Sequence, residues 1–297
     1  MNQFRYDYAV IGGDLRQIYL LSELSKTTHA LCHYALCQPP KQFFPTQHFT
    51  AMTSLETAAA NSRHIICPIP LSKDSDLLNQ SGVKKNIPLK QLLSLLTPEQ
   101  CFFAGCIPDA FHQEALKKSV LVFDFMKDSE LSYFNTIATA EGVICQAITA
   151  SPMNLHKSRC AVLGYGKCGR ILTDDLKRMF CYVTAVSSCK EELAQAALSA
   201  DDAMDLKEFF TCIGEYHFIF NTIPSVILTK DILVHVNPQT RILDIASAPG
   251  GVDYAAAKEL NIPAILCPGL PGKYAPLSSA QAILRCIEKC KRSPDIF

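Results

Sequence analysis

The chain has 297 residues, with 28 Lys or Arg and 28 Asp or Glu, so its formal net charge is zero. This length suits two domains of about 150 residues each. A hydrophobic share of 48% provides for packed cores and argues against disorder. Because no basic run is present, we expect neither a nucleic-acid nor a membrane partner. No apolar stretch reaches the roughly 18 residues that span a bilayer.

The cysteine content and the start of the chain indicate a cytoplasmic protein. Met1 to Tyr8 hold polar residues, an Arg and an Asp, and no apolar signal segment follows. The 14 cysteines lie below the roughly 8–10% of a disulfide scaffold, so we expect reduced, mostly buried thiols. His29, Cys32, His33 and Cys37 lack the spacing of a structural zinc site, and no metal is expected.

Short apolar strands alternate with helical patterns along the chain, which is typical of parallel α/β sheets. In the first half we expect strands at Tyr8–Ile11, Ala30–Leu36, His64–Cys67, Cys101–Ala104 and Val120–Phe123. Helices are expected at Leu15–Ser25, Leu55–Asn61, Leu89–Leu96 and Asp109–Lys117. The long polar segment 68–88 is either a binding loop or a loose connection.

A long helix is predicted over Glu130–Ala150, since apolar residues recur there at spacings of three and four. Ser151 and Pro152 then interrupt the pattern, and a polar segment follows. The predicted domains are therefore 1–151, an N-terminal substrate or catalytic-type domain, and 152–297.

The second half repeats the alternation. Strands are expected at Cys160–Leu163, Tyr182–Val186, His217–Asn221, Arg241–Ile245 and Ala264–Cys267, and helices at Lys167–Phe180, Lys190–Ala197, Leu206–Phe210, Thr229–His235, Tyr254–Leu260 and Leu277–Lys291. The amphipathic helix within 277–292 either packs on its own domain or crosses back to complete the first. The predicted fold is α/β with two doubly wound domains: a flavodoxin- or Rossmann-like N-terminal domain and a C-terminal Rossmann dinucleotide-binding domain.

A glycine fingerprint follows the strand at Cys160–Leu163 and opens a helix. It reads Gly164, Tyr165, Gly166, Lys167, Cys168, Gly169. In such a G-x-G-x-x-G turn the glycines allow a tight turn, close approach of a pyrophosphate and helix–strand packing. The helix start offers N–H groups to the phosphates. The alternative is a glycine-rich turn that binds nothing.

The end of the next strand bears on the choice of dinucleotide. An NAD site usually carries an acid there for the ribose hydroxyls. Here Ser187, Ser188 and Lys190 occupy the position, and no acid precedes Glu191. Two hydroxyls and a lysine suit a 2′-phosphate, so NADP is favoured over NAD. Alternatively, Lys190 is only the solvated first residue of a helix.

Three more segments lie where parallel strands end, the edge at which ligands bind in open α/β sheets. They span 221–225, 244–251 and 268–273, and each is rich in Gly, Pro and small residues. By position, the cofactor-lining candidates in them are Thr222, Ile223, Pro224, Ala246 and Ser247.

The N-terminal turn Gly12, Gly13, Asp14, Leu15, Arg16 is similar in kind. Arginine holds carboxylates through two parallel hydrogen bonds, so Arg16 is a candidate anchor for an acidic substrate. The alternative is an ordinary surface arginine.

Together these motifs resemble the A subunits of dipicolinate synthase from spore-forming bacteria. The resemblance rests on the motifs at 12–16, 139–142, 164–169, 221–225, 244–251 and 268–272, and it covers almost the full chain. It implies an NADP-dependent oxidoreductase that oxidises dihydrodipicolinate, from the lysine-pathway precursor, to dipicolinate during sporulation. It also implies a partner in the form of a flavoprotein-like B subunit, the mother-cell cytoplasm as location, and a two-domain plan like that of 2-hydroxyacid and alanine dehydrogenases.

The resemblance implies a dicarboxylate substrate, for which the candidate binding residues are Arg16, Asp14, Ser247 and Lys273. The group that accepts the proton is not assigned, and a homo-oligomer is left open. Two alternatives remain. One is another NAD(P)-dependent dehydrogenase of hydroxy or amino acids, although no catalytic His with a carboxylate partner is evident. The other is a dinucleotide-binding partner protein without chemistry of its own.

Overall fold

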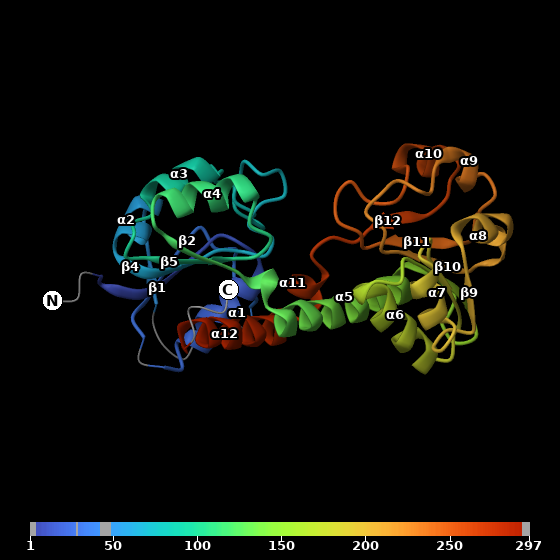
Figure 1. Cartoon of the computed structure of the whole chain (residues 1–297). Coiled ribbons are helices and arrows are strands. Elements are labelled where there is room, and N and C mark those ends of the chain that lie inside the picture. The colour runs from blue at the N-terminus through green and yellow to red at the C-terminus, as the bar shows by residue number, and fades with distance from the viewer. Residues whose placement is uncertain (1–3, 28, 42–48, 293–297) are drawn as a thin grey trace. The chain divides into compact units, whose positions relative to one another are not determined.

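The computed structural model describes residues 4–27, 29–41 and 49–292. The chain forms two compact units, the first comprising Met1–Phe134 and Ala275–Phe297 and the second Asn135–Tyr274 (Figure 1). Helix α5 (Ser129–Ala150) contains the division between them. The boundary expected after residue 151 follows this helix, whereas the units divide inside it. The last helix, α12 (Pro276–Arg292), belongs to the first unit.

The first unit contains one six-stranded parallel sheet. Its strands are β1 (Tyr6–Ile11), β2 (Leu31–Tyr34), β3 (Thr50–Ala51), β4 (Ser62–Ile66), β5 (Cys101–Ala104) and β6 (Leu121–Asp124), in the order β3-β2-β1-β4-β5-β6. This is the Rossmann order 3-2-1-4-5-6, and without the two-residue β3 it becomes the flavodoxin order. The strand order reverses between β1 and β4, so a topological switch point lies there.

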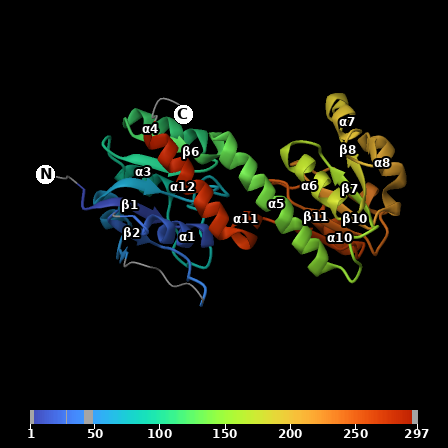
Figure 2. The same ribbon diagram turned by 90° about the horizontal axis from the view of Figure 1, so that it is seen from below.

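Helices cover both faces of this sheet. On one face lie α2 (Leu55–Ala60), α3 (Leu89–Leu95) and α4 (Asp109–Lys117), and on the other α1 (Leu15–Leu24) and α12 (Figure 1). Figure 2, seen from below, shows α1 and α12 in front of the sheet. The apolar side of α12, which includes Ala280, Ile283 and Ile287, is buried against Leu20, Leu21 and Leu24. A short 3-10 turn, η1 (Phe125–Lys127), precedes α5.

The segment 68–88 is packed on the carboxyl edge of this sheet. Leu78 is buried, and the Asn79 carbonyl accepts a 2.9 Å hydrogen bond from the Gly13 amide. The Ser81 amide donates in return to the Gly13 carbonyl, also over 2.9 Å. Of the two expectations for this segment, a loose connection is therefore wrong.

The second unit repeats the plan. Its strands are β7 (Arg159–Leu163), β8 (Tyr182–Val186), β9 (Asp202–Met204), β10 (Phe218–Asn221), β11 (Arg241–Asp244) and β12 (Ala264–Leu266), all parallel, in the order β12-β11-β10-β7-β8-β9. This is again the Rossmann order, with the switch point between β7 and β10. The predicted fold class, two doubly wound α/β domains, is confirmed.

The helices of the second unit are α6 (Lys167–Arg178), α7 (Lys190–Ala196), α8 (Leu206–Cys212), α9 (Lys230–Leu233), α10 (Tyr254–Glu259) and α11 (Leu270–Tyr274), with the 3-10 turn η2 (Ile213–Glu215). Buried side chains of α5 and α6 share one core with β7 and β10, and those of α8, α9 and α10 share the core on the other face. The short elements β3, β9 and α11 and both 3-10 turns were not predicted from the sequence.

Candidate functional site

The glycine fingerprint forms a tight turn from β7 into α6. Gly164 has φ +89°, a conformation that side chains disfavour, and a Cβ there would lie 2.4 Å from Thr222 Oγ1. A Cβ on Gly169 would lie 1.9 Å from the Gly164 carbonyl oxygen. These two glycines are therefore required by the packing of the turn itself, and Thr222 from the end of β10 closes it by donating to the Leu163 carbonyl over 2.9 Å.

The middle glycine differs from the other two. A Cβ on Gly166 would meet no atom within 4 Å, and its φ of −72° is open to any residue. Gly166 is the N-cap of α6, and no side chain caps this helix start. Open space in front of a helix N-terminus fits a phosphate group. The residues present therefore suit a dinucleotide pyrophosphate.

Other residues of the fingerprint serve the fold. The Tyr165 side chain is 3% exposed, and its hydroxyl lies 3.0 Å from Ser199 Oγ, so only its backbone is left for a ligand. Cys168 is half-buried, and burial raises the pKa of its thiol. Lys167 is exposed at the first position of α6.

The end of β8 holds an acid that the sequence analysis did not consider. Ser187 is buried, and its hydroxyl donates to Glu192 Oε2 over 2.5 Å while accepting the Cys189 amide over 3.1 Å. Ser188 and Lys190 are exposed beside it. Glu192 is the third residue of α7, a position from which an acid commonly reaches back to the residues before the helix. Its place three residues after Cys189, the residue that precedes the helix, is the sequence signal that could have revealed this acid.

Asp244, at the end of β11, organises the neighbouring loops. It is fully buried and accepts four hydrogen bonds, none from a charged group. Its donors are Asn221 Nδ2 at 2.8 Å, the Ala246 amide at 3.1 Å, the Gly251 amide at 2.8 Å and the Tyr254 hydroxyl at 2.9 Å. This carboxylate thereby joins β10, β11 and the loop that follows β11. Asp244 is the first residue of the segment 244–251 noted in the sequence, but no role was predicted for it.

The glycines after Asp244 let the loop fold back over it. A Cβ on Gly250 would lie 2.8 Å from Asp244 Oδ2, and one on Gly251 only 2.1 Å from Asn221 Nδ2. The buried carboxylate also changes its neighbours: burial and Asp244 together raise the pKa of the Tyr254 phenol, and raise the pKa of the Cys267 thiol to about 11. Both groups are therefore protonated at neutral pH.

The predicted cofactor-lining residues border this network. Thr222 and Ile223 are half-buried after β10, and Asn221 fixes their loop by donating to the Ile223 carbonyl over 3.0 Å. Pro224 and Ser247 are exposed, and Ala246 is half-buried. All of them follow strands at the carboxyl edge of the sheet, on the β10–β11 side of the switch point.

Lys273 lies on α11, a five-residue helix packed against α5. A Cβ on Gly142 of α5 would lie 2.9 Å from Leu270 Cβ, so this glycine permits the close contact. Gln146 Nε2 donates to the Tyr274 hydroxyl in the same contact. Lys273 itself is exposed, 5.0 Å from the centre of the Tyr274 ring.

In the first unit, Asp14 and Arg16 form a pair at the carboxyl end of β1. Asp14 is the N-cap of α1 in a capping box with Gln17. Arg16 is 3% exposed; its Nε donates to Asp14 Oδ1 over 2.9 Å, and its Nη2 to Asp14 Oδ2 over 2.7 Å. Nη2 also donates to the Ile69 carbonyl, after β4. Arg16 thus joins the two sides of this unit's switch point.

This arrangement bears on the predicted role of Arg16. The alternative expectation, that Arg16 is an ordinary surface arginine, is wrong, because its guanidinium is buried and already holds a carboxylate. A substrate carboxylate would have to share it with Asp14, whose side chain is 20% exposed. Of the four predicted substrate residues, Asp14 and Arg16 lie in the first unit and Ser247 and Lys273 in the second.

The part of the chain that the structure describes offers neither a metal centre nor a membrane span. No three His, Cys, Asp or Glu side chains there are grouped so as to hold a metal ion. No described helix combines the length and the apolar character needed to cross a membrane. All 14 cysteines are free; seven are buried and two, Cys106 and Cys189, are exposed.

Comparisons with known proteins agree with these features. The family model for the N-terminal domain of the dipicolinate synthase A subunit matches residues 7–126. The dipicolinate synthase A subunit of Bacillus subtilis (strain 168) is 29% identical over 283 residues, which are 95% of this chain and 94% of that protein. The predicted resemblance to this family is confirmed.

Solved structures show the same fold. The crystal structure of the dipicolinate synthase A subunit from Bacillus halodurans has a TM-score of 0.81 at 23% identity, covering 97% of this chain and 98% of that chain. An L-alanine dehydrogenase is more distant, with a TM-score of 0.59 at 12% identity over 96% of this chain and 90% of its own. The fold is thus also similar to that of an amino-acid dehydrogenase.

Proposed function

Given this similarity to the dipicolinate synthase A subunit over almost the whole chain, we propose that the protein is the hydride-transferring subunit of such a synthase. It would oxidise dihydrodipicolinate to dipicolinate and reduce NADP⁺ to NADPH, with release of one proton. Bound NADP supplies the hydride acceptor, and the aromaticity of the product favours the reaction.

The observation that carries this proposal is the open space at Gly166. It lies before an uncapped helix start, at the switch point where β7 and β10 adjoin. This is the place at which open α/β sheets bind a dinucleotide. Packing explains the other two glycines of the turn, whereas at Gly166 a Cβ would meet no atom, and the space that it leaves open is what supports a bound ligand there.

The chain's own residues would bind and orient the reactants. The exposed residues Ser188 and Lys190 would receive the 2′-phosphate, and Thr222, Ile223, Pro224, Ala246 and Ser247 would border the ribose and nicotinamide. Arg16, Asp14, Ser247 and Lys273 remain the proposed residues for the two substrate carboxylates. No proton acceptor is proposed.

One observation favours NAD as a second candidate. The Glu192 carboxylate lies 2.5 Å from the Ser187 hydroxyl, at the strand end where NAD sites carry an acid. A carboxylate there would repel a 2′-phosphate, while the exposed Lys190 would attract it. The choice depends on which of these two charges faces the ribose.

The reaction is tested with purified chain, the B-type partner that the family implies, NADP⁺ and the dihydrodipicolinate mixture, by following NADPH absorbance. We expect turnover by the natural chain and none by Gly166→Val, whose side chain would fill the pyrophosphate space. The control is Ala255→Val, at an exposed position of α10. Turnover that survives Gly166→Val would refute the cofactor site, and no turnover by the natural chain would refute the reaction.

The cofactor is tested by titrating NADPH and NADH separately into two variants. Lys190→Ala should weaken NADPH about tenfold or more and leave NADH little changed, since a hydrogen bond to a charged group contributes roughly 1.5–3 kcal/mol. Glu192→Gln should leave NADPH unchanged or tighter. Weaker NADH binding in Glu192→Gln, with no effect of Lys190→Ala, would instead identify NAD as the cofactor.

The proposed partner of the chain and its proposed location are supported by its similarity to the dipicolinate synthase A subunit alone. We propose assembly with a flavoprotein-like B subunit in the cytoplasm of the mother cell. If NADPH binds but the mixture is not oxidised with the B subunit present, the alternatives are a dinucleotide-binding partner without chemistry or a dehydrogenase of other hydroxy or amino acids. A panel of such acids with NADP⁺ would separate these two.

A further inference from the structure

Arg170 stands beside the glycine fingerprint, on the helix that the fingerprint opens. It is the fourth residue of α6 and is exposed, and its Nε donates to the Tyr165 carbonyl over 3.0 Å. Its guanidinium carbon lies 5.6 Å from the centre of the Tyr165 ring. Helical side chains lean toward the N-terminus of their helix. This arginine therefore reaches back over the turn at which we propose that the pyrophosphate binds.

The guanidinium of Arg170 is held in place without being neutralised. Only its Nε is bonded, and both Nη groups lack a hydrogen-bond or ion-pair partner among the described residues. No carboxylate in that part of the chain lies within 4.0 Å of it. The cations in the last turn of the same helix are paired, Lys177 with Asp201 and Arg178 with Asp175 at 3.2 Å. Arg170 thus keeps two parallel donors, with which arginine binds phosphate groups.

Tyr165 places this arginine on the β8 side of the turn. The Tyr165 ring is buried against Ala185 of β8 and Ala196 of α7, and its hydroxyl lies 3.0 Å from Ser199 Oγ. In Rossmann folds the ribose 2′ position of a bound dinucleotide lies on this side, because the residue that reads it follows the second strand. Since Arg170 lies against the same ring, it is on the side of the 2′ position.

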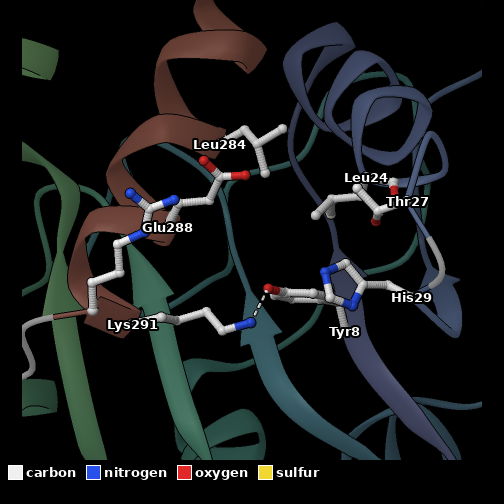
Figure 3. Close-up of a pocket in the computed structure, with 8 residues that line it drawn as sticks. Tyr8, Leu24, Thr27, His29, Leu284, Glu288 and Lys291 are labelled. Atoms are coloured by element: carbon white, nitrogen blue, oxygen red, sulfur yellow. Dashed lines mark hydrogen bonds between the residues drawn. The ribbon is translucent and has the colours of Figure 1, made fainter.

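A cation of the first unit shows that position matters as well as charge. Lys291 of α12 donates to the Tyr8 hydroxyl over 2.9 Å (Figure 3). Tyr8 lies in the first half of β1, whereas open α/β sheets bind dinucleotides beyond the carboxyl ends of their strands. Arg170 adjoins such an end, because the fingerprint directly follows β7. Its place in the sheet and its two unused donors together single out Arg170.

We propose that Arg170 determines the specificity for NADP by binding its 2′-phosphate through the two Nη groups, together with Lys190. This inference rests on the proposed function, because it concerns the same cofactor site. It also bears on the choice between NADP and NAD. The acid at the end of β8, Glu192, already accepts the Ser187 hydroxyl over 2.5 Å. Arg170 adds a second cation to Lys190 on the side of the 2′ position, and two cations favour a phosphate there over a hydroxyl.

The test is calorimetric titration of NADPH and NADH into the full chain and into Arg170→Met, which keeps the apolar stem over the Tyr165 ring. Arg170→Met should weaken NADPH about tenfold or more, because charged hydrogen bonds to the 2′-phosphate are lost. NADH, which lacks this phosphate, should change less than about twofold. Adenosine 2′,5′-bisphosphate and 5′-AMP should show the same difference. The matched control is Arg178→Met, at the other end of α6, which should change each affinity less than about twofold.

Far-ultraviolet circular dichroism confirms that each variant is folded. Arg170→Gln, which can still donate to the Tyr165 carbonyl but carries no charge, should show the same selective loss and decides if Arg170→Met does not fold. Equal weakening of NADPH and NADH overturns the inference, because the arginine would then serve the pyrophosphate or the turn itself. Unchanged NADPH binding overturns it too.

These two outcomes leave the proposed function standing, provided that the natural chain binds NADPH and, with the B-type partner, oxidises the dihydrodipicolinate mixture. If the natural chain binds neither dinucleotide, the proposed cofactor site is refuted and the inference about Arg170 with it. Binding of NADH alone by the natural chain refutes the inference and identifies NAD as the cofactor.

Discussion

Asn221 and Asp244 are register partners at the ends of adjacent strands, and the amide of the first donates to the carboxylate of the second over 2.8 Å. Both side chains are fully buried. The same Asp244 carboxylate accepts the Gly251 amide and the Tyr254 hydroxyl. One buried anion therefore fixes both loops that we propose border the nicotinamide and ribose, without touching solvent itself.

Asp244→Asn should destabilise the second unit by about 3 kcal/mol. The new amide would place N–H donors against the donors of Gly251, Tyr254 or Asn221, and buried donors without acceptors cost roughly 1–3 kcal/mol each. Urea unfolding at neutral pH measures the change. The control is Asp231→Asn, an exposed aspartate of α9, which should change stability by less than about 0.5 kcal/mol. Equal effects in the two variants would disprove the role of the network.

The two later glycines of the fingerprint should respond in opposite ways to alanine. Gly169→Ala should cost about 2–3 kcal/mol of stability, because its Cβ would collide with the Gly164 carbonyl and the turn would have to open. Gly166→Ala should leave stability within about 0.5 kcal/mol, since its Cβ meets nothing, but should weaken the dinucleotide. Thermal unfolding and NADPH titration of both variants separate packing from ligand binding.

His64 should make the first unit acid-sensitive. Its pKa is about 4 in the folded chain and 6.5 unperturbed, so below pH 6.5 the unfolded state takes up a proton that the folded state does not. Stability is therefore unaffected above pH 6.5 and is lost as the pH falls toward 4. Between about pH 7.5 and pH 5 the loss should reach about 2 kcal/mol.

The measurement for His64 is the urea midpoint at both pH values in the natural chain and in His64→Leu. The variant should lose about 2 kcal/mol less on acidification, because no imidazole titrates at that position. His156→Gln, at an exposed histidine, serves as control and should lose as much stability on acidification as the natural chain does. A pH dependence unchanged by His64→Leu would contradict the prediction.

Lys289→Met and Arg285→Met should differ in their effect on the free energy of unfolding, although both remove a cation of α12. Asp128, the partner of Lys289, is 3% exposed; burial opposes its ionisation, but hydrogen bonds from Lys289 and the Leu131 amide lower its pKa below the ordinary value. Loss of Lys289 leaves that carboxylate buried without its cation, at a cost of about 1–3 kcal/mol. Loss of Arg285 breaks an exposed pair worth less than about 0.5 kcal/mol. Urea unfolding compares them.

Apolar patterning predicted the main strands and helices because each buries a face whose period is visible in the sequence. The short edge strands β3 and β9 were missed, since two or three residues carry no period and pair only because a neighbouring strand is there. Helix α11 was missed for a related reason. It contains Pro271 and Gly272, and it is held by its contact with α5.

At the candidate site, the sequence predicted the local geometry of the turns but not the contacts between distant segments. The turn at Gly164 to Gly169 follows from residue type alone. The burial of Tyr165 and the bond from Asn221 to Asp244 depend on segments that approach only in the folded unit. Arg16 is an intermediate case, because Asp14 and Gln17 have the spacing of a capping box, which places an acid next to the arginine.

The return of α12 to the first unit has a consequence for biosynthesis. A ribosome releases residues 135–274 as one uninterrupted stretch, so the second unit can fold as soon as that stretch has emerged. The first unit begins earlier but must wait for Ala280, Ile283 and Ile287 to cover Leu20, Leu21 and Leu24. The part of the protein that is made first is thus completed last, and until then its exposed leucines need protection from aggregation.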